Sequence, residues 1–351
     1  MSLSLAGLPQ AAPLVAASPR DLRGRPLHDL RVSVIETCNY RCPYCMPEGS
    51  TPPPDEVLDS ETRLSFEEIE QAVRAFVSQG VRKLRLTGGE PLLRRNLPDL
   101  VARLAAIPGV DDLALTTNGS LLAGKARALR AAGLHRLTVS LDALDPGVFR
   151  ALSGNRGEVA DVLAGIAAAE AAGFRSLKIN CVLQRGANES QVLPLAERFR
   201  GTPHVLRFIE YMDVGSCNGW SAERVLPSRE ALDLIAARWP LRALSPAYRG
   251  EVAARYAYAD GAGEIGFVSS VSAPFCGDCH RARLSADGRL YTCLFASEGA
   301  DLRPALAQGE AALAARIATL WGARGDRYSE LRGALADKPP RRRIEMFYIG
   351  G

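Results

Sequence analysis

The 351-residue sequence has no hydrophobic run that approaches the ~20 apolar residues needed to cross a bilayer. Its N-terminus lacks the basic region and apolar core of a secretory signal, and we find neither internal repeats nor a coiled-coil pattern. Lysine is scarce, at four of 43 basic residues, and the net charge of +4 is too mild for a general nucleic-acid surface. We therefore expect a cytoplasmic enzyme with no membrane or nucleic-acid partner.

The length predicts about two domains. A hydrophobic content of 47% and a charged content of 23% are ordinary for a globular protein. Residues 1–23 are rich in Ala, Pro, Leu and Ser without periodicity, which predicts a disordered leader.

Six of the eight cysteines fall in two tight triplets, which indicates metal sites more than disulfides. That usage favours a reducing compartment. The remaining two, Cys181 and Cys217, are expected to be buried free thiols.

The first triplet has the spacing C-x3-C-x2-C and directly follows the strand-like run 32–35; its members are Cys38, Cys42 and Cys45. A cubane iron–sulfur cluster normally takes four thiolates. Three thiolates on one loop would leave one iron open to bind a second molecule, so that the cluster acts as a reagent. A zinc knuckle, or three unrelated thiols, is the less specific alternative.

From residue 24 to 225, strand-like runs alternate with helix-like runs. We expect strands at 31–35, 82–87, 112–117, 136–141, 176–183 and 204–210, and helices at 66–79, after Pro98, and at 121–132, 158–172 and 189–200. Ser65 and Glu68 predict a capping box for the first helix. Six strand–helix repeats predict an α/β fold with a parallel sheet. A doubly wound sheet stays open as an alternative, but we favour an open partial (β/α)6 TIM-like barrel.

The pattern changes after residue 225. A helix is expected at 228–238, strands at 254–259 and 264–271, and a helix at 309–322. Strands 281–286 and 289–295 predict a hairpin that turns at Asp287-Gly288. We therefore predict a C-terminal α+β domain at 226–351 that carries the second metal site and covers the barrel mouth.

Strand parity predicts what the barrel mouth binds. Four consecutive strands carry a polar residue on the face opposite their aliphatic residues, namely Arg85, Thr116, Ser140 and Lys178. In a barrel these side chains would point inside, where unpaired charge is costly and an anionic, phosphorylated ligand would offset it. A partly solvated polar face of the sheet is the alternative. Gly88-Gly89 at the second strand end would let the backbone approach a ligand.

The second triplet is Cys276, Cys279 and Cys293. Zinc with His280 as fourth ligand, or a second cluster with one open iron, would both fit this spacing. Arg281 and Arg283 alternate on the following strand and suit an anion, although arginine is also common at a solvated sheet edge.

Several separate motifs together resemble the radical S-adenosylmethionine (SAM) superfamily. They are 29–33 leading into the first triplet, Leu86-Thr87-Gly88-Gly89-Glu90-Pro91, 115–119, Val139-Ser140-Leu141-Asp142 and 207–213. The run 276–293 and the closing Gly350-Gly351 are similar to the narrower GTP 3′,8-cyclase family of molybdenum cofactor biosynthesis.

This resemblance implies two [4Fe–4S] clusters, one on each triplet, with the first binding SAM and the second facing GTP. The SAM-contacting positions implied are Tyr44, Gly89, Ser140 and Met212, and the GTP-binding positions are Arg31, Arg85, Thr116, Lys178, Arg281, Ala282 and Arg283. It further implies a 5′-deoxyadenosyl radical that takes the ribose 3′ hydrogen to give 3′,8-cyclo-7,8-dihydro-GTP.

The partners implied by the resemblance are a reducing electron donor and a downstream cyclic pyranopterin monophosphate synthase, with a homodimer among the alternatives. Two other functions are weighed. One is a radical SAM enzyme whose auxiliary cluster serves a peptide or other substrate, and the other is a zinc- or cluster-bearing binding protein. The Arg-x-Arg after the second triplet and the Gly-Gly end favour the cyclase.

Overall fold

The computed structural model describes residues 18–49, 58–59, 61–335 and 343–351. Most of the predicted leader, residues 1–17, lies outside the described residues. Within residues 18–23 of the predicted leader, Asp21 is buried, whereas Arg20, Leu22 and Arg23 are exposed. Asp21 is 6% exposed and accepts a hydrogen bond from Arg25 Nε at 2.5 Å. The backbones of Arg20 and Pro26 form an isolated antiparallel β-bridge. This buried ion pair holds Asp21 next to Arg25 at the start of the described chain.

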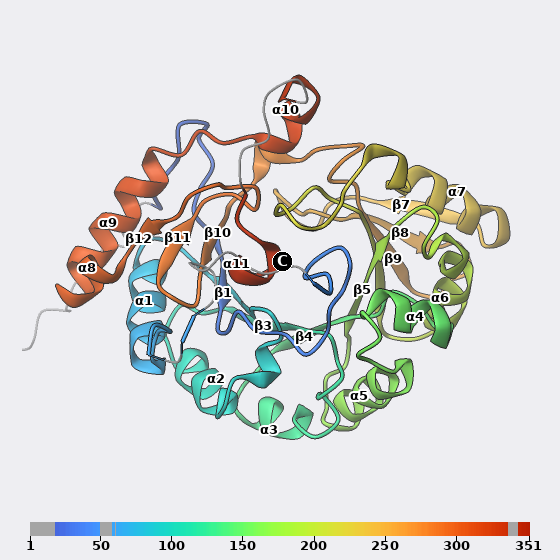
Figure 1. Cartoon of the computed structure of the whole chain (residues 1–351), viewed down its shortest axis with the longest axis horizontal. Helices are drawn as coiled ribbons and strands as arrows, with labels where there is room; N and C mark the ends of the chain where they lie inside the picture. Colours follow the sequence, from blue (N-terminus) through green and yellow to red (C-terminus); the bar gives the residue numbers. More distant parts are fainter. Residues whose placement is uncertain (1–17, 50–57, 60, 336–342) are drawn as a thin grey trace, which may run out of the picture.

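Six parallel strands form the central part of the sheet, in the order in which they occur in the chain. They are β1 (Asp29–Ser33), β2 (Lys83–Thr87), β3 (Asp112–Thr117), β4 (Arg136–Ser140), β5 (Lys178–Leu183) and β6 (Val205–Glu210). The helices on the outside of this curved sheet are α1 (Phe66–Ser78), α2 (Leu97–Ala105), α3 (Ala126–Ala131), α4 (Pro146–Leu152), α5 (Val159–Ala171) and α6 (Val192–Phe199) (Figure 1). The predicted open partial barrel is confirmed.

Strands from the C-terminal part of the chain extend both ends of this sheet. On one side β10 (Arg281–Leu284) runs parallel to β1 and is followed by β11 (Arg289–Tyr291) and β12 (Ala300–Asp301); on the other side β9 (Glu264–Val268) runs parallel to β6 and is followed by β8 (Ala254–Tyr258) and β7 (Leu241–Leu244). The twelve strands form one sheet that does not close. The proposed division at residue 225 therefore separates segments that share a sheet.

The remaining helices follow the C-terminal strands. They are α7 (Ser228–Arg238), α8 (Arg303–Ala307), α9 (Glu310–Gly322), α10 (Tyr328–Leu335) and the short α11 (Met346–Ile349), with 3-10 turns at Pro91–Leu93, Glu189–Gln191, Ala222–Arg224 and Cys276–Asp278. Figure 1 places α11 and the C-terminus over the middle of the barrel. This end of the chain therefore covers the mouth of the barrel.

The main core lies between the strands and the surrounding helices. Leu84, Leu86, Leu113, Leu115 and Val139 are at most 2% exposed, as their strand parity predicts. The predicted capping box also forms at the start of α1: Glu68 N donates to Ser65 Oγ at 3.1 Å, and Ser65 N donates to Glu68 Oε2 at 2.7 Å. None of the described helices is long and apolar enough to cross a membrane.

Candidate active site

The first cysteine triplet lies on the loop after β1, at the carboxyl end of the sheet. Cys45 N and Met46 N both donate to Cys42 O at 2.9 Å, which folds the loop into a tight turn. Burial raises the pKa of Cys38 to about 11 and also raises that of Cys42 and Cys45. Thiols held in this way become thiolates only next to strong positive charge, which the irons of a cluster supply.

The thiolate sulfur atoms around a cubane cluster are spaced differently from those around a single zinc ion. Around one zinc ion, thiolates at about 2.3 Å would lie about 3.8 Å apart. Among the described residues, one set of three potential ligands has its atoms within 4.8 Å of one another, and it is neither of the two cysteine triplets. In a cubane each thiolate binds a different iron, so the sulfurs stand further apart. Either triplet would supply three of the four thiolates that a cubane normally takes.

All four residues expected to contact SAM line one cavity together with the first triplet, namely Tyr44, Gly89, Ser140 and Met212. Tyr44 donates its hydroxyl to Asp142 Oδ2 at 2.6 Å, which ties the cysteine loop to the end of β4. At Gly89 a Cβ would lie 2.2 Å from Thr37 O, so no other residue fits there without moving the cysteine loop.

A second cavity, which shares lining residues with the first, is lined by six of the seven residues expected to contact GTP. They are Arg31, Arg85, Thr116, Lys178, Arg281 and Arg283. The seventh, Ala282, is fully buried and belongs to the core, so its side chain does not face this cavity. The two cavities share Thr116, Asn180, Ile209, Met212, Met346 and Gly351.

The register of the sheet places cations of the second cavity side by side. Arg31 pairs with Arg283 of β10 on one side and with Arg85 of β2 on the other. Burial and the neighbouring arginines lower the pKa of Arg85 to about 10 and that of Arg283 to about 9. The two carboxylates that act on Arg85 are engaged elsewhere, since Asp29 pairs with His28 and Asp112 with Arg136. A row of desolvated cations calls for a polyanionic ligand.

Lys178 faces the same cavity from β5. Burial, followed by the positive charges of Arg207 and Arg136, lowers its pKa to about 6. Arg207 lines the cavity as well, and its buried Nε has no hydrogen-bond partner among the described residues. Parity along β6 could have revealed Arg207, because its side chain opposes the buried Leu206 and Phe208. Arg136 begins β4, where a strand pattern read from sequence is weakest.

The second triplet borders this cavity of cations. Arg281 Nη2 lies 3.2 Å from Cys279 Sγ, and Arg324 Nη1 donates to Cys279 O at 2.6 Å. Burial alone would raise the pKa of Cys279, but the two guanidinium groups outweigh it and lower the pKa to about 6. These two arginines therefore favour the thiolate form of Cys279, which is the form that binds a metal. His280 directs its Nδ1 at Asp29, whose Oδ1 lies 3.4 Å away.

The C-terminal glycines reach into the site. Arg283 Nη1 donates to Gly350 O, and Gly351 lines both cavities. A Cβ on Gly350 would lie 2.1 Å from Thr87 Cγ2 at the end of β2, and its φ of +72° also favours glycine. The end of the chain thus lies between the two cysteine triplets and can position or shield a ligand there.

The fold and the first cysteine loop define a radical SAM protein. Residues 32–199 match the radical SAM superfamily, and residues 204–330 match the family described as Molybdenum Cofactor Synthesis C. The structure is similar to the crystal structure of Streptococcus suis SuiB bound to S-adenosylmethionine, with a TM-score of 0.56 at 13% identity, over 77% of this chain and 60% of that one. At this identity the likeness concerns the fold alone.

Two relatives narrow the class. The chain is 66% identical to the GTP 3′,8-cyclase of Xanthomonas axonopodis pv. citri over 96% of its own length and all of that protein, and 50% identical to the GTP 3′,8-cyclase of Acidothermus cellulolyticus over 95% of its own length and 99% of that protein. The chain belongs to the GTP 3′,8-cyclase family.

Proposed function

We propose that this enzyme uses SAM to convert GTP into 3′,8-cyclo-7,8-dihydro-GTP, the first step of molybdenum cofactor biosynthesis. One observation carries the proposal. Two cavities, each bordered by a cysteine triplet, share residues such as Thr116, Met212 and Gly351, and one of them is lined by desolvated cations. A radical generated beside one triplet would therefore meet a polyanionic substrate held beside the other.

The cysteines would hold two [4Fe–4S] clusters. The cluster on Cys38, Cys42 and Cys45 would leave one iron for SAM, and when bound the pair supplies the 5′-deoxyadenosyl radical that takes the ribose 3′ hydrogen. Tyr44, Gly89, Ser140 and Met212 would position SAM. Cys276, Cys279 and Cys293 would hold the second cluster, whose open iron would face the guanine base.

The chain itself contributes positioning and electrostatics. Arg31, Arg85 and Arg283 would bind the triphosphate, whose negative charge offsets the cost of burying three guanidinium groups. Lys178, Arg281 and Thr116 would complete the substrate contacts. The ribose would then lie near the residues shared by the two cavities, within reach of the radical. The short helix α11 and Gly351 would keep water and stray C–H bonds away.

The proposed reaction needs two partners besides SAM and GTP. The reductive cleavage of SAM requires a strongly reducing electron donor, because cluster potentials near the low end of roughly −700 to +450 mV are involved. The cyclised nucleotide needs a downstream enzyme, for which cyclic pyranopterin monophosphate synthase is the candidate. We also propose a homodimer as the form to test first.

The test is an anaerobic incubation of the reconstituted enzyme with SAM, GTP and a strong reductant. We expect 5′-deoxyadenosine and a cyclised nucleotide only when GTP is present. Cys293→Ser should abolish the cyclised product, whereas Cys181→Ala, which alters a buried thiol outside both cavities, should retain it. Formation of 5′-deoxyadenosine that does not depend on GTP, or that a peptide stimulates instead, would favour the peptide-modifying alternative and contradict the proposal.

A further inference from the structure

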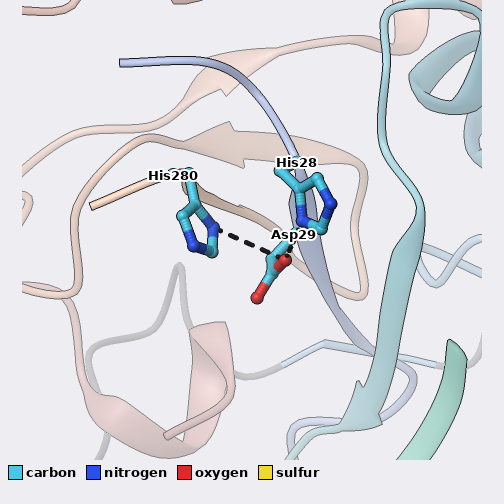
Figure 2. Close-up of side chains that lie close together, drawn as sticks. All are labelled: His28, Asp29 and His280. Carbon is cyan, nitrogen blue, oxygen red and sulfur yellow. Dashed lines mark hydrogen bonds and ion pairs between the residues drawn. The ribbon is translucent and has the colours of Figure 1, made fainter. Parts of the chain in front are cut away.

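Two histidines and an aspartate gather at the amino ends of β1 and β10, on the opposite edge of the sheet from the first cysteine loop. His28 Nδ1 lies 2.6 Å from Asp29 Oδ1, and His280 Nδ1 lies 3.4 Å from the same oxygen. Figure 2 shows both imidazole rings directed at this carboxylate. All three ligand atoms lie within 4.8 Å of one another.

An ordinary hydrogen-bonded cluster does not account for all three side chains. His280 is 7% exposed, and its Nδ1 has no hydrogen-bond partner among the described residues. Its 3.4 Å separation from Asp29 exceeds the usual hydrogen-bond length. A buried ring nitrogen without a partner is unfavourable, and a metal ion shared with His28 and Asp29 would satisfy it.

The spacing is close to that of a tetrahedral metal site. Ligand atoms at about 2.0–2.1 Å from one ion lie about 3.3 Å apart. The separation of 3.4 Å between His280 and Asp29 already matches, and the 2.6 Å between His28 and Asp29 would open slightly. Both histidines line a pocket together with Tyr248, Lys83 and Asp278, from which water could complete the coordination.

The backbone holds these ligands in place before any ion binds. His28 N and Asp29 N both donate to His280 O at 3.1 Å, which joins the starts of the two strands. The His280 ring packs edge-on to His28 with 5.3 Å between centroids, and Tyr248 lies on another side at 6.4 Å. At Gly250 a Cβ would lie 2.4 Å from His280 Cδ2, so this loop closes tightly over the ring.

The ligand types indicate the class of ion. Imidazole nitrogens favour zinc and similar first-row transition ions, whereas magnesium and calcium favour sites built only of oxygens. Lys83, whose Nζ lies 3.7 Å over the Tyr248 ring, adds positive charge nearby and further disfavours ions held by charge alone. We propose that His28, Asp29 and His280 bind a zinc-like dication that fastens β10 to β1. This site would brace the strand that follows Cys279, independently of the reaction proposed above.

The test uses the enzyme with both clusters loaded. It is incubated anaerobically with one equivalent of Zn²⁺ and freed of unbound metal, and its zinc and iron are then measured together with zinc-edge X-ray absorption. We expect about one zinc per chain with nitrogen and oxygen ligands only, and an iron content unchanged at about eight. His28→Ala should weaken zinc binding by at least about 100-fold, because losing an outer partner alone costs roughly 10–100-fold.

His135→Gln is the matched control, because it removes another of the four histidines from outside the cluster, and it should retain the zinc. The iron content of each variant reports whether it folded. If His28→Ala does not fold, His28→Gln replaces it in the zinc-binding measurement. No retained zinc, sulfur ligands around the zinc, or equal affinity in the wild type and a folded His28 variant would each overturn the proposal.

Discussion

The lowered pKa of Lys178 makes nucleotide binding depend on pH in a definite direction. With a pKa of about 6 instead of the ordinary 10.5, this side chain is neutral in about 99% of molecules at pH 8 before a ligand binds. A bound triphosphate stabilises the ammonium form and raises the pKa again. Binding at pH 8 therefore takes up about one proton from solution.

The magnitude follows from this proton. Between pH 7.5 and 8.5 the lysine is neutral in the free enzyme and charged in the complex. The dissociation constant for GTP should therefore rise about tenfold for each unit by which the pH is raised. Burial and the surrounding cations both lower the pKa of Lys178, so both keep this side chain neutral until the nucleotide binds.

Isothermal titration calorimetry in buffers of different ionisation enthalpy measures the uptake directly. The anaerobic, cluster-loaded enzyme should take up about one proton per GTP at pH 8. Lys178→Met should abolish most of the uptake. Lys125→Met, at the start of the outer helix α3, is the control and should leave it unchanged. No proton uptake by the wild type at pH 8 would refute the reasoning, as would equal uptake by wild type and Lys178→Met.

Three further predictions concern the two cavities and the N-terminal contact. Arg283→Ala should weaken GTP binding by at least about tenfold through the loss of a buried charge-assisted contact, while SAM affinity, measured by equilibrium dialysis, stays within about twofold; equal loss of both would contradict the site map. Cys293→Ser should lower the iron content from about eight to about four per chain after reconstitution, and retention of about eight would exclude this ligand set. Asp21→Ala should destabilise the protein by about 1.5–3 kcal/mol in denaturant titration, because it removes a buried carboxylate from Arg25 and Arg324 and leaves them Asp326 as their carboxylate partner; a change below about 0.5 kcal/mol would show that Asp21 is dispensable.

The strands that form the cavity could be predicted because each carries a polar residue on the face opposite its buried aliphatic residues. Parity alone placed Arg85, Thr116 and Lys178 on the ligand side. The same rule excludes Ala282, which opposes Arg281 and Arg283 and belongs to the core. Only the family resemblance implied Ala282 as a GTP-binding residue. Because its side chain is buried in the core, a ligand could contact only its backbone.

Other features depend on contacts that no local pattern contains. The parallel pairing of β10 with β1 brings Arg283 beside Arg31 and His280 beside Asp29, and neither stretch of sequence specifies the other. The sequence pattern did not predict helix α4, because Asp145-Pro146 is typical of a turn as well as of a helix start. Asp145 Oδ1 accepts a hydrogen bond from Val148 N at 2.9 Å, and Pro146 takes the first helical position. The same two residues therefore start a helix.

The pairing of β1 with β10 also has a consequence for how the chain assembles during synthesis. The contact between Arg25 and Cys276 spans 251 residues, so β1 presents an unpaired edge on this side until most of the protein has left the ribosome. Closing so long a loop is slow compared with forming the neighbouring β1–β2 pair. The loop of Cys38 is complete long before Cys293 emerges, and we expect iron to be loaded at the two sites in that order.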